Sequence, residues 1–148
     1  MSKVIKHRLL YADDLIKILS PVILCAGFHI LEDEIINTAN YQTISLNLPL
    51  AKALEGKTEN EITTTITAIA LNLLPKNTPI YLIDYEMLFD PRYSIDPIKL
   101  FIEIARYNKL IVKWCGTIQN NDTLVYSVPG YQDYSRFKIS DYDITVVM

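Results

Sequence analysis

The stretch that decides the fold class of this protein is residues 79–116, PIYLIDYEMLFDPRYSIDPIKLFIEIARYNKLIVKWCG. Its first segment, 79–84, is a short apolar run ending in an acid, which is typical of a buried strand. Asp96-Pro97 predicts the start of a helix, because Asp is a favoured N-cap and Pro suits the first helical position. A second apolar run, 109–116, ends in glycine and predicts another strand. The stretch therefore predicts a strand–helix–strand unit.

The same pattern extends in both directions from this unit. Apolar runs predict further strands at 21–27, 43–48, 123–128 and 143–148, with a hairpin turn at residues 120–122. Helical spacing of apolar residues predicts helices at 3–19, 31–39 and 59–74. Alternating strands and helices predict an α/β fold, with a mainly parallel sheet and helices on both faces. We expect the whole chain, 1–148, to be a single domain with an N-terminal amphipathic helix.

Composition restricts the class of function. Half of the 148 residues are apolar and the net charge is −3, with no block of basic residues, so we expect no direct contact with nucleic acid. No apolar run approaches the ~20 residues needed to span a membrane, and acids interrupt the N-terminal segment. We therefore expect a cytoplasmic protein that does not bind membranes. The two cysteines, Cys25 and Cys115, lack metal-ligand spacing, so we expect no metal site.

Residues 55–58, EGKT, end like the phosphate-binding loop G-x-x-x-x-G-K-[ST]. The first glycine of such a loop is replaced by Ala51, and the intervening residues are helix formers. Thr58 and Glu61 also form an S/T-x-x-E capping box, which predicts the start of the 59–74 helix. The capping box is the favoured interpretation, with Lys57 on the surface.

A better position for a phosphate loop follows the strand at 21–27. Gly27 stands where the first glycine would be, but the lysine and hydroxyl positions carry Asp33 and Glu34. Two carboxylates suit a helix N-terminus but repel a triphosphate. This segment therefore predicts a poor ATP site.

The C-terminal half resembles the BrxF family, the small P-loop protein of type 3 bacteriophage-exclusion (BREX) systems. The resemblance is carried by LIDYEMLFDPRYSIDPIKLFIEIARYNKLIVKWCG and by LVYSVPGYQDYSRF. It implies a P-loop NTPase-like three-layer sandwich in which Asp84 or Glu86 corresponds to the acid on the metal side of an ATP–magnesium site. The family is expected to carry an intact phosphate loop. This chain departs from the family at Asp33 and Glu34, which indicates a degenerate site comprising Gly27, Asp33, Glu34, Asp84 and Glu86.

Individual residues leave alternatives open. Asp84 and Glu86 could hold magnesium as in an ATPase, or make turn and helix-cap hydrogen bonds, which is the favoured interpretation. Trp114 could be a core residue or an interface anchor. Arg136 lies near Tyr131 and Tyr134 and could serve an interface, act as an arginine finger, or stack on a tyrosine.

The resulting hypothesis is a non-catalytic, P-loop-like component of a bacterial phage-defence complex of BREX type 3. It would act through protein–protein contacts with other defence-system proteins, or with itself as a homo-oligomer, and without a cofactor. One alternative is an active ATPase or nucleotide sensor that uses ATP and magnesium. A second alternative is a DNA-contacting adaptor, which the acidic charge disfavours.

Overall fold

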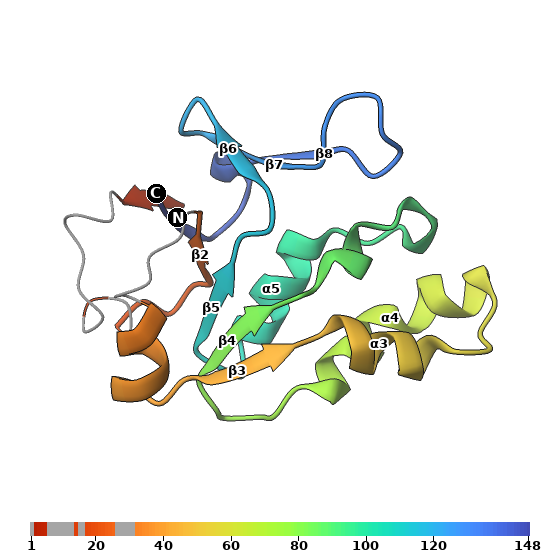
Figure 1. Cartoon of the computed structure of the whole chain (residues 1–148), viewed down its shortest axis with the longest axis horizontal. Helices are drawn as coiled ribbons and strands as arrows, with labels where there is room; N and C mark the ends of the chain where they lie inside the picture. The colour runs from red at the N-terminus through yellow and green to blue at the C-terminus, as the bar shows by residue number, and fades with distance from the viewer. Residues whose placement is uncertain (1, 6–13, 15–16, 26–31) are drawn as a thin grey trace.

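The computed structural model describes residues 2–5, 14, 17–25 and 32–148. Among these residues, six strands form one sheet in which every neighbouring pair is parallel. The order is β1-β9-β2-β5-β4-β3. The bounds are β1 Lys3–Ile5, β9 Thr145–Val147, β2 Val22–Leu24, β5 Leu110–Lys113, β4 Ile80–Ile83 and β3 Gln42–Ser45. The expected parallel α/β sheet is confirmed (Figure 1).

The central unit forms as the sequence predicts: β4, then helix α5 (Pro97–Ala105), then β5 alongside β4. Asp96 caps α5, because its Oδ1 accepts hydrogen bonds from the backbone N–H groups of Ile98 (2.9 Å) and Lys99 (3.4 Å). Its other carboxylate oxygen accepts a hydrogen bond from the Tyr142 hydroxyl at 2.7 Å. The cap therefore also connects α5 to the C-terminal part of the chain.

Side chains alternate between the two faces of the sheet. Ile80 and Leu82 belong to the larger core, together with buried residues of helices α3 (Asn47–Leu54), α4 (Glu59–Leu73) and α5. Tyr81 belongs to a smaller core on the opposite face, with Ile35 of the short helix η2 (Glu34–Thr38). Helices thus pack on both faces, although the described helical cover is much greater on one.

Two sequence expectations are corrected by the structure. The predicted 3–19 helix begins as strand β1, parallel to β9; Asp14 is helical, as predicted, whereas residues 17–19 are not. Backbone pairing with the sheet edge outweighs the weak helical spacing there; residues 6–13 and 15–16 of that prediction lie outside the described residues. The predicted 43–48 strand ends at Ser45, because the N–H groups of Leu46 and Asn47 both bond to the Asp84 carbonyl and start α3.

A small antiparallel sheet of β6 (Thr117–Gln119), β7 (Thr123–Tyr126) and β8 (Ser135–Lys138) follows β5. The predicted turn at 120–122 joins β6 to β7, with positive φ at Asn120 (54°) and Asn121 (57°), as hairpin turns require. Strands β6 and β8 were not predicted. Gly116 leads into this sheet and has no room for a side chain, because a Cβ there would lie 1.9 Å from the Val125 carbonyl oxygen.

Candidate functional site

The carboxyl ends of the parallel strands form the first candidate site. Helix η2, the first described helix after β2, packs on one face of the sheet, whereas α3 and α5, which follow β3 and β4, pack on the other. Ligands of parallel α/β sheets bind where neighbouring connections diverge in this way. The site is thus the edge around the ends of β2, β5 and β4.

Asp84 follows β4 in a left-handed conformation (φ 49°), which is uncommon for a residue other than glycine. Its carboxylate accepts a hydrogen bond from the Ser45 hydroxyl at 2.8 Å. Its backbone carbonyl accepts the two N–H groups that start α3. Asp84 therefore joins the ends of β3 and β4 through both its side chain and its backbone.

Glu86 makes a second set of structural contacts. Its Oε2 accepts a hydrogen bond from the side-chain amide of Asn47 at 2.8 Å, and the carbonyl oxygen of that amide accepts the Met87 N–H at 3.0 Å. These bonds hold the first turn of α3 against the short helix η3 (Glu86–Phe89). The observed contacts of both acids are thus turn and helix-end hydrogen bonds to uncharged donors.

Tyr85 stands between these two acids in the sequence, and Cys115 lines the same cleft as they do. The buried Tyr85 hydroxyl donates to the Lys113 carbonyl (2.7 Å) and accepts the Cys115 N–H (3.2 Å). Burial raises the pKa of the Cys115 thiol to about 12, so this thiol is protonated at neutral pH and is a poor nucleophile. Burial likewise raises the pKa of Tyr85. Neither group is suited to act as a base.

The cleft at this edge has a volume of about 170 Å³ and is lined by Ile83, Asp84, Glu86, Lys113, Trp114 and Cys115. Ligand pockets for molecules of drug or cofactor size are typically about 300–1,000 Å³. The cleft that the described residues form at this edge is smaller than that range.

The acidic turn predicted to replace a phosphate loop is only partly described. Gly27 lies outside the described residues. Asp33 is exposed and accepts a hydrogen bond from the Asn37 side chain at 2.6 Å, while Glu34 begins η2. Glu32 reaches the end of β5, with its Oε1 3.8 Å from Lys113 Nζ. The structure therefore brings a third acid and a lysine to this edge, beside Asp84 and Glu86.

Sequence reasoning missed three of these residues: Ser45, Asn47 and Lys113. Ser45 and Lys113 are the last residues of β3 and β5, and Asn47 is the first residue of α3. The strands predicted at 43–48 and 109–116 run past all three residues, so the sequence did not mark them as strand ends. Which of these residues lie next to one another depends on the order of the strands in the sheet, and the spacing of residues along the sequence does not give that order.

The EGKT stretch lies elsewhere, in the turn between α3 and α4 that points away from the sheet (Figure 1). Gly56 has φ 78°, and Thr58 is the N-cap of α4, where its Oγ1 accepts the Glu61 N–H at 3.2 Å. Lys57 is exposed. The predicted role of Thr58 as the N-cap of this helix is confirmed, and its hydroxyl also donates to Glu61 Oε1 at 3.2 Å.

The residues predicted for an interface occupy different environments. Trp114 is buried, donates its indole N–H to the Thr117 carbonyl at 2.9 Å, and contacts Phe89 edge-on. Tyr131 is 67% exposed, and Arg136 is exposed on β8. Tyr134 is half-buried. Trp114 is therefore a core residue, which is one of the alternatives that the sequence left undecided, while Tyr131 and Arg136 are accessible.

Comparisons with known proteins give no match: no family model, no curated protein and no solved structure resembles the chain significantly. Within the ranges that the structure describes, no three His, Cys, Asp or Glu side chains are grouped as metal ligands would be. No helix in those ranges combines the length and apolar character needed to cross a membrane.

Proposed function

We propose that this protein is a non-catalytic, P-loop-like component of a bacterial phage-defence complex of the BREX type 3 kind, and that it acts by binding other proteins of that system. One observation carries the non-catalytic part of the proposal. Asp84 and Glu86, the acids that would serve a nucleotide, are hydrogen-bonded to Ser45 and Asn47 and hold α3 in place. Acids used in this way stabilise the fold.

The topology is compatible with a P-loop-like three-layer arrangement. The strand before the acidic turn, β2, lies between β9 and β5 inside a parallel sheet, and helices pack on both faces. A phosphate loop in such a sheet would follow β2. The family resemblance of the 82–116 stretch supports the assignment to this class.

Charge opposes nucleotide binding at this edge. Glu32, Asp33, Glu34, Asp84 and Glu86 contribute five carboxylates after β2 and β4, and Lys113 is already close to Glu32. Each like-charge contact at ~4 Å costs about 1 kcal/mol in water and more in a cleft that excludes water. About 4 kcal/mol separates micromolar from millimolar affinity. A few such contacts therefore suffice to remove useful affinity for a triphosphate.

Calorimetric titration with ATP and magnesium tests the non-catalytic part. We expect a dissociation constant in the millimolar range or weaker, and no ATP hydrolysis. A low-micromolar constant would favour the nucleotide-sensor or ATPase alternative. The double variant Asp33→Lys/Glu34→Thr removes two carboxylates and supplies the missing residue types; we expect at most partial recovery of binding, because the glycine-rich backbone is still absent.

Co-expression with the other proteins of a type 3 BREX system tests the binding part. We expect the chain to co-purify with at least one of them in a defined stoichiometry. Light scattering of the chain alone separates self-association from binding to a different protein. Retention on duplex DNA in the absence of any partner would instead favour a DNA-contacting adaptor.

A further inference from the structure

A second, larger cleft adjoins the cleft at the strand ends, and Glu86 lines both. It has a volume of about 720 Å³ and is formed by two segments, residues 86–92 and residues 131–133. The first segment contains η3 and the first two residues of η4 (Pro91–Tyr93), and the second belongs to the loop that joins β7 to β8. In Figure 1 this loop projects from the small antiparallel sheet over the rest of the chain. We call this site the hairpin cleft.

Carboxylates stand on both walls of the hairpin cleft. Glu86 lies on one wall and Asp133 on the other. The pKa of Tyr126 is raised, first by burial and also by the negative charges of Asp133 and Glu86. The two acids, far apart in sequence, therefore act on the same region of space.

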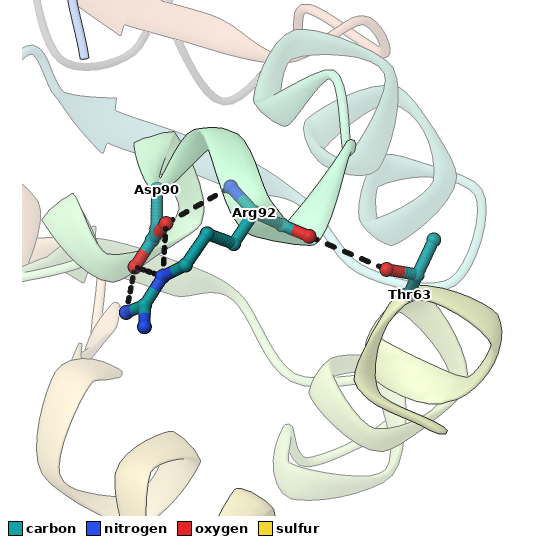
Figure 2. A network of polar contacts seen from close by, with 3 residues as sticks. All are labelled: Thr63, Asp90 and Arg92. Carbon is teal, nitrogen blue, oxygen red and sulfur yellow. Dashed lines mark hydrogen bonds and ion pairs between the residues drawn. The ribbon is translucent and has the colours of Figure 1, made fainter. Parts of the chain in front are cut away.

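The arginine that lines the cleft is already neutralised. Arg92 Nη2 lies 2.6 Å from Asp90 Oδ2, and Arg92 Nε also bonds to the same carboxylate, as Figure 2 shows. The hydrogen bonds from Arg92 lower the pKa of Asp90. The Arg92 carbonyl accepts a hydrogen bond from Thr63 of α4 at 3.4 Å, which ties this turn to the helix layer. The pair has no net charge, so Glu86 and Asp133 give the cleft an excess of negative charge.

Two aromatic rings line the cleft, alongside Met87, Pro91 and Gln132. Phe89 lines the cleft and stacks on Tyr126, with ring centroids 3.9 Å apart and 9° between the planes. Tyr131 lines the rim and is 67% exposed. Carboxylates beside an accessible aromatic ring, here that of Tyr131, suit a planar cation, which gains from charge and from contact with the ring.

We propose that the hairpin cleft binds an arginine side chain presented by a partner protein. This inference rests on the proposed role in protein binding and adds the surface and the chemistry of the partner. Arginine is favoured over lysine because its flat guanidinium can stack on Tyr131 while donating hydrogen bonds to Glu86 or Asp133. The single arginine would be the anchor of a larger contact.

NMR titration of the ¹⁵N-labelled full chain with N-acetylarginine amide tests the inference directly. We expect saturable shifts at backbone amides of residues 86–92 and 131–133, with millimolar affinity. N-acetylcitrulline amide, which has nearly the same shape and no charge, is the control ligand and should produce no comparable shifts. Equal shifts with the two ligands, or shifts confined to another surface, would overturn the proposal.

Two variants and a matched control locate the effect. Asp133→Asn removes one charge from the cleft and should weaken arginine binding about threefold, the size expected for a partly exposed charge pair. Tyr131→Ala removes the accessible ring and should weaken it by a similar factor. Glu55→Gln removes one exposed carboxylate in the α3–α4 turn and should leave binding unchanged. Equal affinity in Asp133→Asn and the unaltered protein would contradict the assignment.

These experiments distinguish failure of the arginine proposal from failure of the proposed function. If a defence-system protein co-purifies equally well with the unaltered chain and with Asp133→Asn, and arginine does not bind, the hairpin cleft is not the interface while the binding role stands. If no partner co-purifies but arginine binds as described, the cleft recognises arginine and the proposed function is wrong.

Discussion

Substitution of Lys57 and Thr58, one at a time, separates a phosphate loop from a capping box. In a phosphate loop the lysine contributes most, since it contacts the phosphates. In the structure Lys57 is exposed, and its backbone N–H, which donates to the Leu54 carbonyl at 3.1 Å, is retained in alanine. We therefore expect Lys57→Ala to change the free energy of unfolding by no more than about 0.5 kcal/mol.

Thr58 should matter more than Lys57. Its Oγ1 accepts the Glu61 N–H and donates to Glu61 Oε1, both at 3.2 Å, at the start of the 15-residue helix α4. Loss of such a cap typically costs about 1 kcal/mol. Thr58→Ala should therefore lower the unfolding free energy by about that amount, whereas Thr58→Ser keeps the hydroxyl and should restore most of it.

Urea unfolding followed by the fluorescence of Trp114, the single tryptophan, measures both effects. With a slope of about 2 kcal/mol per molar urea, Thr58→Ala should move the midpoint by roughly 0.5 M, and Lys57→Ala by much less. The reasoning fails if Lys57→Ala is as destabilising as Thr58→Ala. It also fails if Lys57→Ala abolishes a measurable ATPase activity that the unaltered protein possesses.

Three further predictions concern the fold that supports the sites. Gly116→Ala should destabilise the protein by more than about 2 kcal/mol in urea unfolding, because its Cβ would collide with the Val125 carbonyl; stability close to that of the unaltered chain would contradict the observed packing. Asp96→Ala should cost about 2–4 kcal/mol through the lost cap and the lost bond to Tyr142, and a double-mutant cycle with Tyr142→Phe should reveal coupling between the two residues. Burial raises the pKa of the Cys115 thiol in the folded protein from 9.0 to about 12, so the thiol ionises at lower pH in the unfolded chain than in the folded one. The free energy of unfolding should therefore fall as pH rises from about 9 to 12. Cys115→Ala should make that fall smaller.

Local sequence patterns account for the helix caps and for the positions of the central strands. The Asp96 and Thr58 caps depend on residues only a few positions apart, so the side chains that form them are visible in the sequence. The strand–helix–strand unit at 79–116 also appears where the sequence predicts it, because its strands are continuous apolar runs, although they pair over a long separation, with Ile80 opposite Leu110. The parallel character of the sheet also follows, because helices alternate with its strands.

Contacts between distant segments determined the rest. Lys3–Ile5 becomes a strand because the edge of β9 offers unpaired backbone groups, and residues 43–48 divide into a strand and a helix because the Asp84 carbonyl captures two N–H groups. Ser45 bonds to Asp84 because β3 and β4 are neighbours in the sheet, and Glu86 and Asp133 line one cleft because of the path of the β7–β8 loop. The order of the strands is set by the free energy of the whole folded chain, so no short stretch of the sequence determines it.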